Sequence, residues 1–116
     1  MDLPEDAALL RIFVGEADHL GGRPLYEAIV LEARSRGLAG ATVLRGMLGF
    51  GRSSRIHTTR VLRLSDDLPI VIEIVDREEN LAKLLPWLDE VVIDGLVTLE
   101  RVRVKRYAAS SRKPRA

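Results

Sequence analysis

The chain has 116 residues, of which 47% are hydrophobic and 30% are charged, and it contains no cysteine. This length and composition predict one domain with a hydrophobic core. The lack of cysteine excludes disulfides and thiolate metal sites, and the sequence has no run of about 18 apolar residues that could span a membrane. We therefore expect a cytoplasmic protein.

The formal net charge of +1 conceals an uneven distribution. Residues 1–99 carry 11 basic and 16 acidic side chains, whereas residues 100–116 carry 7 and 1. We expect a single domain over residues 1–107 and a basic, disordered tail over residues 108–116. Such a tail can also contact nucleic acid, although an aromatic content of 4% argues against a base-stacking platform.

The first half of the sequence predicts a strand, a helix and a second strand. Residues 9–14 alternate between two largely apolar faces, which is typical of a buried strand. A loop over residues 15–22 precedes a helix that opens at Arg23 and stops at Gly37. The helix has one apolar stripe, formed by Leu25, Ala28, Ile29 and Ala33. Residues 41–48 predict the next strand.

The second half predicts two strands, a helix and a last strand. Residues 58–64 and 69–75 have strand patterns, and the latter segment is rich in β-branched side chains. Asp76, with an acid three residues later, resembles a capping box at the start of a helix. Pro86 should kink this helix, because proline removes a backbone hydrogen bond. Residues 96–107 predict the last strand.

These elements reduce to the order β-α-β-β-α-β when residues 58–64 are treated as an extra short strand. We therefore predict an α+β, ferredoxin-like fold, with one antiparallel sheet and two helices on one of its faces. The opposite face would then be apolar, formed by Leu9, Phe13, Val43, Met47, Val71 and Val75. Since an exposed apolar face of this size disfavours a monomer, we expect a homo-oligomer.

Two clusters of basic residues are candidates for anion binding. Residues 40–63 contain five arginines, no acid and a set of closely spaced glycines, Gly46, Gly49 and Gly51. They predict either an anion-binding loop or a flexible hairpin connection with a solvated basic face, and they match neither a Walker loop nor a dinucleotide fingerprint. On the last strand, Arg101, Arg103 and Lys105 share one face. This face is either part of an anion site or a strand surface that charge protects from edge pairing.

Several motifs in combination resemble the PII signalling superfamily. They are Gly40-Ala41-Thr42-Val43, Gly49-Phe50-Gly51-Arg52, Leu68-Pro69-Ile70-Val71-Ile72-Glu73 and Val102-Arg103-Val104-Lys105. The chain is also similar to a short bacterial family within it, number one hundred and ninety in the domain-of-unknown-function series. That resemblance rests on Gly15-Glu16, Arg23-Pro24-Leu25-Tyr26, Gly37-Leu38-Ala39-Gly40-Ala41, Gly49-Phe50-Gly51 and Ile56-His57-Thr58.

The resemblance implies a regulatory homotrimer that binds an adenine nucleotide, such as AMP, ADP or a cyclic nucleotide, in clefts between subunits. The loop over residues 46–60 would dock on a membrane transporter or an enzyme and bring the protein to the inner face of the membrane. With Arg45 added from the arginine cluster, the candidate ligand-binding residues are Thr42, Arg45, Gly49, Phe50, Gly51, Arg52, His57, Thr58, Arg103 and Lys105.

One feature of the PII proteins is missing from this sequence. Before the last strand they carry a phosphate loop of the Gly-Lys-Ile-Gly-Asp-Gly-Lys type, whereas this chain has only Val92-Ile93-Asp94-Gly95-Leu96. The departure favours a smaller or differently held anion, such as a nucleoside monophosphate.

No nucleophile–base pair and no metal-ligand cluster is recognisable in the sequence, so we expect neither enzymatic activity nor a bound metal. Two alternatives to ligand sensing stay open. They are nucleic-acid binding through the basic tail and a purely structural role as an oligomeric interaction module.

Overall fold

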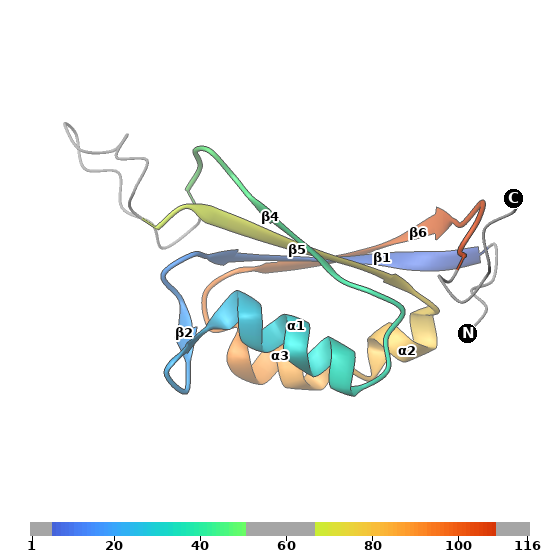
Figure 1. Ribbon diagram of the computed structural model, residues 1–116, viewed down its shortest axis with the longest axis horizontal. Helices are drawn as coiled ribbons and strands as arrows, with labels where there is room; N and C mark the ends of the chain where they lie inside the picture. Colours follow the sequence, from blue (N-terminus) through green and yellow to red (C-terminus); the bar gives the residue numbers. More distant parts are fainter. Residues whose placement is uncertain (1–5, 51–66, 109–116) are drawn as a thin grey trace, which may run out of the picture.

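The computed structural model describes residues 6–50 and 67–108 (Figure 1). The strands of its main sheet are β1 (Asp6–Gly15), β4 (Thr42–Arg45), β5 (Pro69–Asp76) and β6 (Leu96–Arg103). The helices are α1 (Leu25–Ser35), α2 (Glu78–Ala82) and α3 (Leu85–Val91), and a short hairpin pairs β2 (His19–Leu20) with β3 (Arg23–Pro24). Within these ranges no helix is long and apolar enough to cross a membrane.

The main sheet has the strand order β4-β5-β1-β6, and each neighbouring pair is antiparallel. The helices of the described chain lie along one face of the sheet, with the predicted second helix present as α2 and α3 (Figure 1). The prediction of an α+β, ferredoxin-like fold is confirmed. The predicted extra strand over residues 58–64 falls outside the described residues.

The core lies between the sheet and the helices. Alternate residues of β1 and β5 are completely buried there, namely Leu10, Ile12, Ile72 and Ile74. The helices contribute their own apolar stripes, formed by Leu25, Ile29, Ala33, Leu81, Leu84 and Leu88. Because successive strand residues face opposite ways, each central strand supplies one set of side chains to this core and a second set to the other face.

Pro86 interrupts the second helix, as predicted from the sequence. Helix α2 ends at Ala82 and α3 begins at Leu85, so the proline lies in the first turn of α3, where its missing N–H has no intrahelical partner to lose. The Arg36 side chain, at the end of α1, donates from Nη1 to the carbonyl oxygen of Lys83 at 3.1 Å. This contact ties α1 to the turn between α2 and α3.

The predicted capping box at the start of α2 is wrong. The N-cap residue is Arg77, and it makes no side-chain capping bond. The fully buried Asp76 carboxylate accepts hydrogen bonds from the backbone N–H of Arg77 (2.6 Å), the side-chain amide of Asn80 (2.9 Å) and the backbone N–H of Ala39 (2.8 Å). Asp76 therefore joins β5 and α2 to the connection between α1 and β4.

Two strands are shorter than predicted. Strand β4 stops at Arg45 and not at residue 48, because the chain turns at Gly46, whose N–H donates to the Pro69 carbonyl oxygen at 2.7 Å. Strand β6 stops at Arg103 and not at residue 107, since Arg103 already pairs with Asp6, the first residue of β1.

The beginning of α1 also differs from the sequence prediction. The region expected to be a loop, residues 15–22, contains β2, and Arg23 and Pro24 form β3 instead of opening the helix. The helix begins two residues later than predicted, at Leu25, whose N–H donates to the Asp18 carbonyl oxygen at 2.7 Å. The short hairpin thus sets the position at which α1 starts.

The face of the sheet opposite the helices consists of cross-strand rows fixed by the register. One row is apolar throughout, composed of Leu44, Val71, Phe13 and Leu96. The next row is polar, composed of Thr42, Glu73, Arg11 and Thr98. A further row brings together Val75, Leu9 and Glu100. We call this surface the open face.

The expected composition of the open face is therefore partly wrong. Val43 pairs with Ile72 and so belongs to the helix-covered side, while Met47 lies beyond the end of β4. An ion-pair network crosses the middle of the open face: the Arg11 guanidinium contacts Glu73 at 2.8 Å and Glu100 at 2.9 Å. The hydrogen bond with Glu73 raises the pKa of Arg11 above its ordinary value, and the negative charges of both carboxylates act in the same direction.

Candidate functional site

The chain makes a tight turn around Pro69 where it leaves β4. A Cβ atom at Gly46 would lie 2.7 Å from Cγ of Pro69, and one at Gly49 would lie 3.1 Å from the same atom. A side chain at Gly46 would thus collide with the proline ring, and one at Gly49 would be crowded by it. Close packing against β5 therefore requires glycine at position 46 and favours it at position 49.

Arg45 is held at this turn by an acid from another part of the chain. Its Nε and Nη2 atoms lie 3.0 Å and 3.2 Å from the two carboxylate oxygens of Glu16, a paired arrangement that fixes the plane of the guanidinium. Glu16 is itself anchored, because its backbone N–H donates to the carbonyl oxygen of Leu68 at 2.8 Å. Arg45 is therefore oriented, and part of its charge is compensated by Glu16.

The turn after β1 is braced by carboxylates. Asp67 accepts a hydrogen bond from the N–H of Ala17 at 2.8 Å, and Asp18 accepts one from the N–H of Gly15 at 2.9 Å. His19 is exposed, and its Nδ1 lies 2.5 Å from the carbonyl oxygen of Ala17. Within the described ranges, no group of three His, Asp or Glu side chains is placed to hold a metal ion.

Apolar side chains project from the same turn. Met47, Leu48 and Phe50 are 81%, 60% and 72% exposed, respectively. Gly46 and Gly49 pack tightly on Pro69, so the chain runs around the proline ring. The side chains of Met47, Leu48 and Phe50 point away from the core. We call residues 45–50, together with Glu16 and Pro69, the loop base.

The candidate ligand-binding residues fall into three groups. Arg45, Gly49 and Phe50 lie together in the loop base, whereas Thr42 lies at the opposite end of β4, on the open face beside Glu73. Arg103 and Lys105 lie at the end of β6 and just beyond it. The remaining candidates, Gly51, Arg52, His57 and Thr58, fall outside the described residues.

The loop base and the end of β6 lie at opposite ends of the sheet (Figure 1). Arg45 pairs with Ile70, which pairs with Val14 near the end of β1, whereas Arg103 pairs with Asp6 at the beginning of β1. Eight residues of an extended strand separate these positions, a distance of about 27 Å. One copy of the chain does not bring the two basic clusters together.

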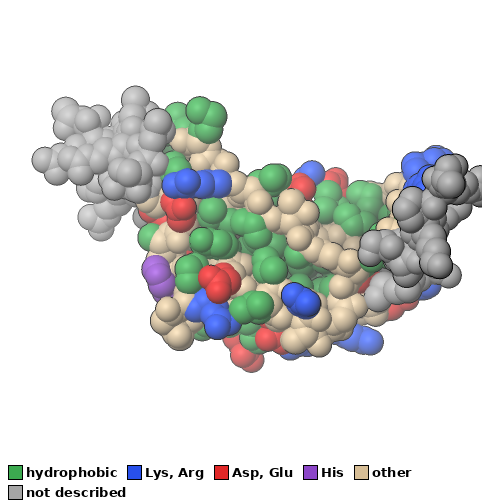
Figure 2. Space-filling view, viewed as in Figure 1, with side chains coloured by type: hydrophobic (Ala, Val, Ile, Leu, Met, Phe, Trp, Pro, Cys, Tyr) green, Lys and Arg blue, Asp and Glu red, His purple; other side chains and the backbone are tan. Residues whose placement is uncertain are grey.

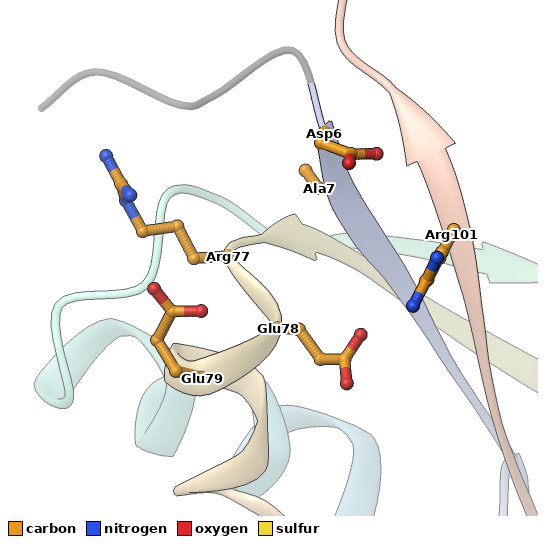
Figure 3. Close-up of a pocket in the computed structure, with 6 residues that line it drawn as sticks. All are labelled: Asp6, Ala7, Arg77, Glu78, Glu79 and Arg101. Atoms are coloured by element: carbon orange, nitrogen blue, oxygen red, sulfur yellow. The ribbon is translucent and has the colours of Figure 1, made fainter.

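A hollow of about 310 Å³ opens near the end of β6, between that strand, the start of β1 and the start of α2 (Figure 3). Its lining combines both signs of charge and consists of Asp6, Ala7, Arg77, Glu78, Glu79 and Arg101. Three carboxylates against two guanidinium groups do not favour an anionic ligand, and neither Arg103 nor Lys105 lines the hollow.

The space-filling view shows the same balance of charge over one side of the molecule (Figure 2). Hydrophobic side chains gather across its middle, and basic side chains lie beside acidic ones along its lower edge. The described part of the surface on this side is therefore not uniformly basic.

Sequence reasoning missed three residues that organise these regions. Glu16 was noticed only as part of a motif, although an acid directly after a strand could have been considered as a partner for the arginine cluster. Asp76 was assigned to a cap, and Tyr107 carried no recognisable signal. The Tyr107 hydroxyl donates to the carbonyl oxygen of Ala39 at 3.0 Å, a contact between residues far apart in the sequence.

The link between α3 and β6 is short in the structure as well as in the sequence. Helix α3 ends at Val91 and β6 begins at Leu96, which leaves residues 92–95 as the connection. These residues include no lysine or arginine. Positive charge for an anion at the sheet ends must therefore come from elsewhere in the chain.

Comparison with known proteins supplies the context for this arrangement. Residues 7–104 match the model of the family DUF190, described as "Uncharacterized ACR". A UPF0166 protein of Aquifex aeolicus (strain VF5) is 40% identical over 98 residues, which cover 83% of this chain and 90% of that protein.

Solved structures of CPII from Thiomonas intermedia K12 have a similar fold. The structure bound to ADP and bicarbonate has a TM-score of 0.66 at 21% identity, with coverage of 87% of this chain and 90% of CPII. The structure bound to ADP, AMP and acetate has a TM-score of 0.63 at 20% identity, with coverage of 91% and 94%. CPII is described as a nitrogen regulatory PII-like protein.

Proposed function

The chain belongs to the DUF190 family and has a PII-like fold. From that premise we propose that it is a regulatory protein that binds a small anionic ligand between the subunits of a homotrimer. The ligand is an adenine nucleotide, either AMP, ADP or a cyclic nucleotide. Ligand binding changes how the loop over residues 46–60 engages a partner protein, which is a membrane transporter or an enzyme. The chain itself has no catalytic role.

The observation that carries this proposal is the separation of the two basic clusters. Through the register of the sheet, Arg45 on β4 lies level with the end of β1, whereas Arg103 on β6 lies level with its beginning. A site that uses both arginines therefore needs two copies of the chain. In the proposed cleft, one subunit supplies the loop base and its neighbour supplies the end of β6. The contributing residues are Thr42, Arg45, Gly49, Phe50, Gly51, Arg52, His57 and Thr58 from the first, with Arg103 and Lys105 from the second.

The open face supports self-assembly. Its apolar row, centred on Val71 and Phe13, is not covered by any helix of the described chain. Packing this row against other copies removes apolar surface from water, which favours association. Next to this row, Arg11 forms ion pairs with Glu73 and Glu100 within one chain. Because these charges already compensate one another in part, burying them between subunits costs less free energy than burying unpaired charges.

The sparse positive charge supports a ligand with few phosphate groups. The connection over residues 92–95 carries no cation, and Arg45 is shared with Glu16. Arg103 and Lys105 add two further positive charges among the described candidates. Arginine binds phosphate through paired hydrogen bonds and lysine as a point charge, which together suit one or two phosphate groups.

The exposed apolar side chains of the loop base support a protein partner. Met47, Leu48 and Phe50 lie within four residues of the sequence and are largely exposed. Exposed methionine and aromatic side chains are frequent anchors of protein interfaces. The loop base would thus serve two roles, in the ligand cleft and at the partner.

The proposal is tested by titrating the purified protein with AMP, ADP and cyclic AMP in a calorimeter, and by native mass spectrometry of protein taken from cells. We expect a trimer that binds one nucleotide per subunit. Replacing Arg103 and Lys105 together by alanine should lower the affinity for AMP at least about tenfold, because two charge-assisted contacts are lost. Replacing Arg34, an exposed arginine of α1, should leave the affinity unchanged. A protein that releases no heat with any of these nucleotides would contradict the proposal.

A further inference from the structure

The backbone of Ala39 is held from both sides. Its N–H donates to a carboxylate oxygen of Asp76 at 2.8 Å, and its carbonyl oxygen accepts a hydrogen bond from the Tyr107 hydroxyl at 3.0 Å. We call this pair of bonds the Ala39 contact. It joins the segment after β6 to the connection between α1 and β4, although the two are 68 residues apart in the sequence.

The Asp76 side of the contact is rigid. Asp76 is fully buried, and its second carboxylate oxygen is engaged by the N–H of Arg77 and the amide of Asn80. A buried carboxylate with three hydrogen bonds is well satisfied and strongly disfavours any rearrangement that would leave it unpaired. The backbone of Ala39 is consequently a rigid attachment point for the segment that follows β6.

The Tyr107 side of the contact holds a segment that has little other support. Strand β6 ends at Arg103, and residues 104–108 pair with no strand of the described chain. Among the described residues, the bond from Tyr107 is the one hydrogen bond that joins residues 104–108 to another segment, and Val104 contributes a partly buried side chain. Tyr107 therefore anchors the chain two residues after the exposed Lys105, as the Arg103–Asp6 pair does two residues before it.

We propose that Tyr107 is a positioning residue for phosphate binding by Lys105, acting through the Ala39 contact. This inference rests on the proposed function, since it assigns the anchoring of one half of that ligand site. Because Ala39 lies three residues before Thr42, the same contact links the end of β6 to the start of β4 within one subunit, although Thr42 and Lys105 of that subunit belong to different proposed clefts. Holding Lys105 in place before the ligand arrives reduces the ordering cost of binding.

The contact itself can be tested without any ligand. Trypsin cleaves after Lys105 and Arg106, and mass spectrometry of the full-length protein follows cleavage at these bonds. Tyr107→Phe removes only the hydroxyl group and should speed cleavage there about fivefold, as expected for the loss of one hydrogen bond. Tyr26→Phe is the control, because Tyr26 is half-buried against the core and makes no hydrogen bond among those of the described residues. Equal cleavage rates for Tyr107→Phe and the wild type would overturn the anchoring role.

Calorimetry then tests the link to phosphate binding. Tyr107→Phe should weaken AMP binding about fivefold and leave adenosine binding unchanged, because adenosine has no phosphate for Lys105 to contact. In the background of Lys105→Ala, Tyr107→Phe should cause no further loss, since the two residues act on the same contact. Equal losses for AMP and adenosine, or additive losses in the double variant, would overturn the proposal.

The failure of this inference can be distinguished from the failure of the proposed function. A wild-type protein that binds no adenine nucleotide would overturn the proposed function and the phosphate-binding role of Lys105 together. A wild-type protein that binds AMP, with an affinity that Tyr107→Phe does not change, would overturn only the positioning role of Tyr107.

Discussion

The two faces of the main sheet are built from the same strands, but the helices of the described chain cover only one of them. On the helix-covered face, Ile72 and Leu10 are fully buried within one copy of the chain. On the open face, the neighbouring Val71 and Phe13 stay half-buried, next to a network of charged side chains. The first face accounts for the fold of a subunit, whereas the second is left uncovered by the helices of the described chain.

The comparison predicts its largest effect on the helix-covered face. Ile72→Ala should lower the free energy of unfolding by about 3–4 kcal/mol, because it removes apolar contacts and leaves a cavity in the middle of the core. Denaturant unfolding followed by circular dichroism measures this loss. Val71→Ala is the matched control one residue away, and it should lower the free energy of unfolding by about 1 kcal/mol. If Val71 lies between subunits, this loss should depend on protein concentration. Equal losses at every concentration would remove the distinction between the faces.

The next effect concerns the apolar row of the open face. Phe13→Glu places a charge in the middle of this row, so the proposed trimer should dissociate while each subunit keeps its helices. Analytical ultracentrifugation reports the mass of the assembly and circular dichroism reports the fold. The control is Leu31→Glu, because Leu31 is an exposed leucine on α1, away from the sheet. If Phe13→Glu leaves the assembly intact, the open face is not the interface.

The smallest effect is expected for the ion-pair network. Arg11→Met leaves Glu73 and Glu100 without their shared cation, and two like charges close together should weaken assembly several-fold. Sedimentation at a series of protein concentrations measures the change. Arg23→Met should have no effect, since the Arg23–Glu27 pair is exposed, 3.8 Å apart and on the helix side. Stronger assembly in Arg11→Met would mean that the network opposes association.

A change of pH is not a substitute for the Arg11 variant. The pKa of Arg11 is raised, so its positive charge, and the part of the stability that comes from it, is fully present at every pH below the ordinary arginine value. That contribution is lost only as the pH rises through the raised value. From mildly acidic to mildly alkaline solution, the titration of Arg11 therefore leaves assembly unchanged.

Local patterns in the sequence were sufficient to predict the type and order of most elements. The alternation in residues 69–75 and the apolar stripe from Leu25 to Ala33 each have a period that belongs to one kind of secondary structure. The break at Pro86 follows from the chemistry of a single residue. The three groups of candidate site residues could not be ordered in space by the same reasoning, because strand register is not a local property.

The assignment of Val43 illustrates the limit. Its alternation with Thr42 and Leu44 was evident from the sequence, but a shift of one residue in pairing exchanges the two faces, and only the bond pattern with β5 decides between them. The pairing of Arg45 with Glu16 and of Tyr107 with Ala39 has the same origin, since each joins segments that meet only after the sheet has formed.

By itself, the sequence determined the periodicities, the breaks and the glycines, and hence a two-layer α+β domain with helices on one face of its sheet. Tertiary structure alone decided which side chains share a row, which carboxylates compensate the arginines and how far apart the two basic clusters lie. The physical reason is that periodicity arises within one segment of chain, whereas register, ion pairs and distances across the sheet arise from packing between segments.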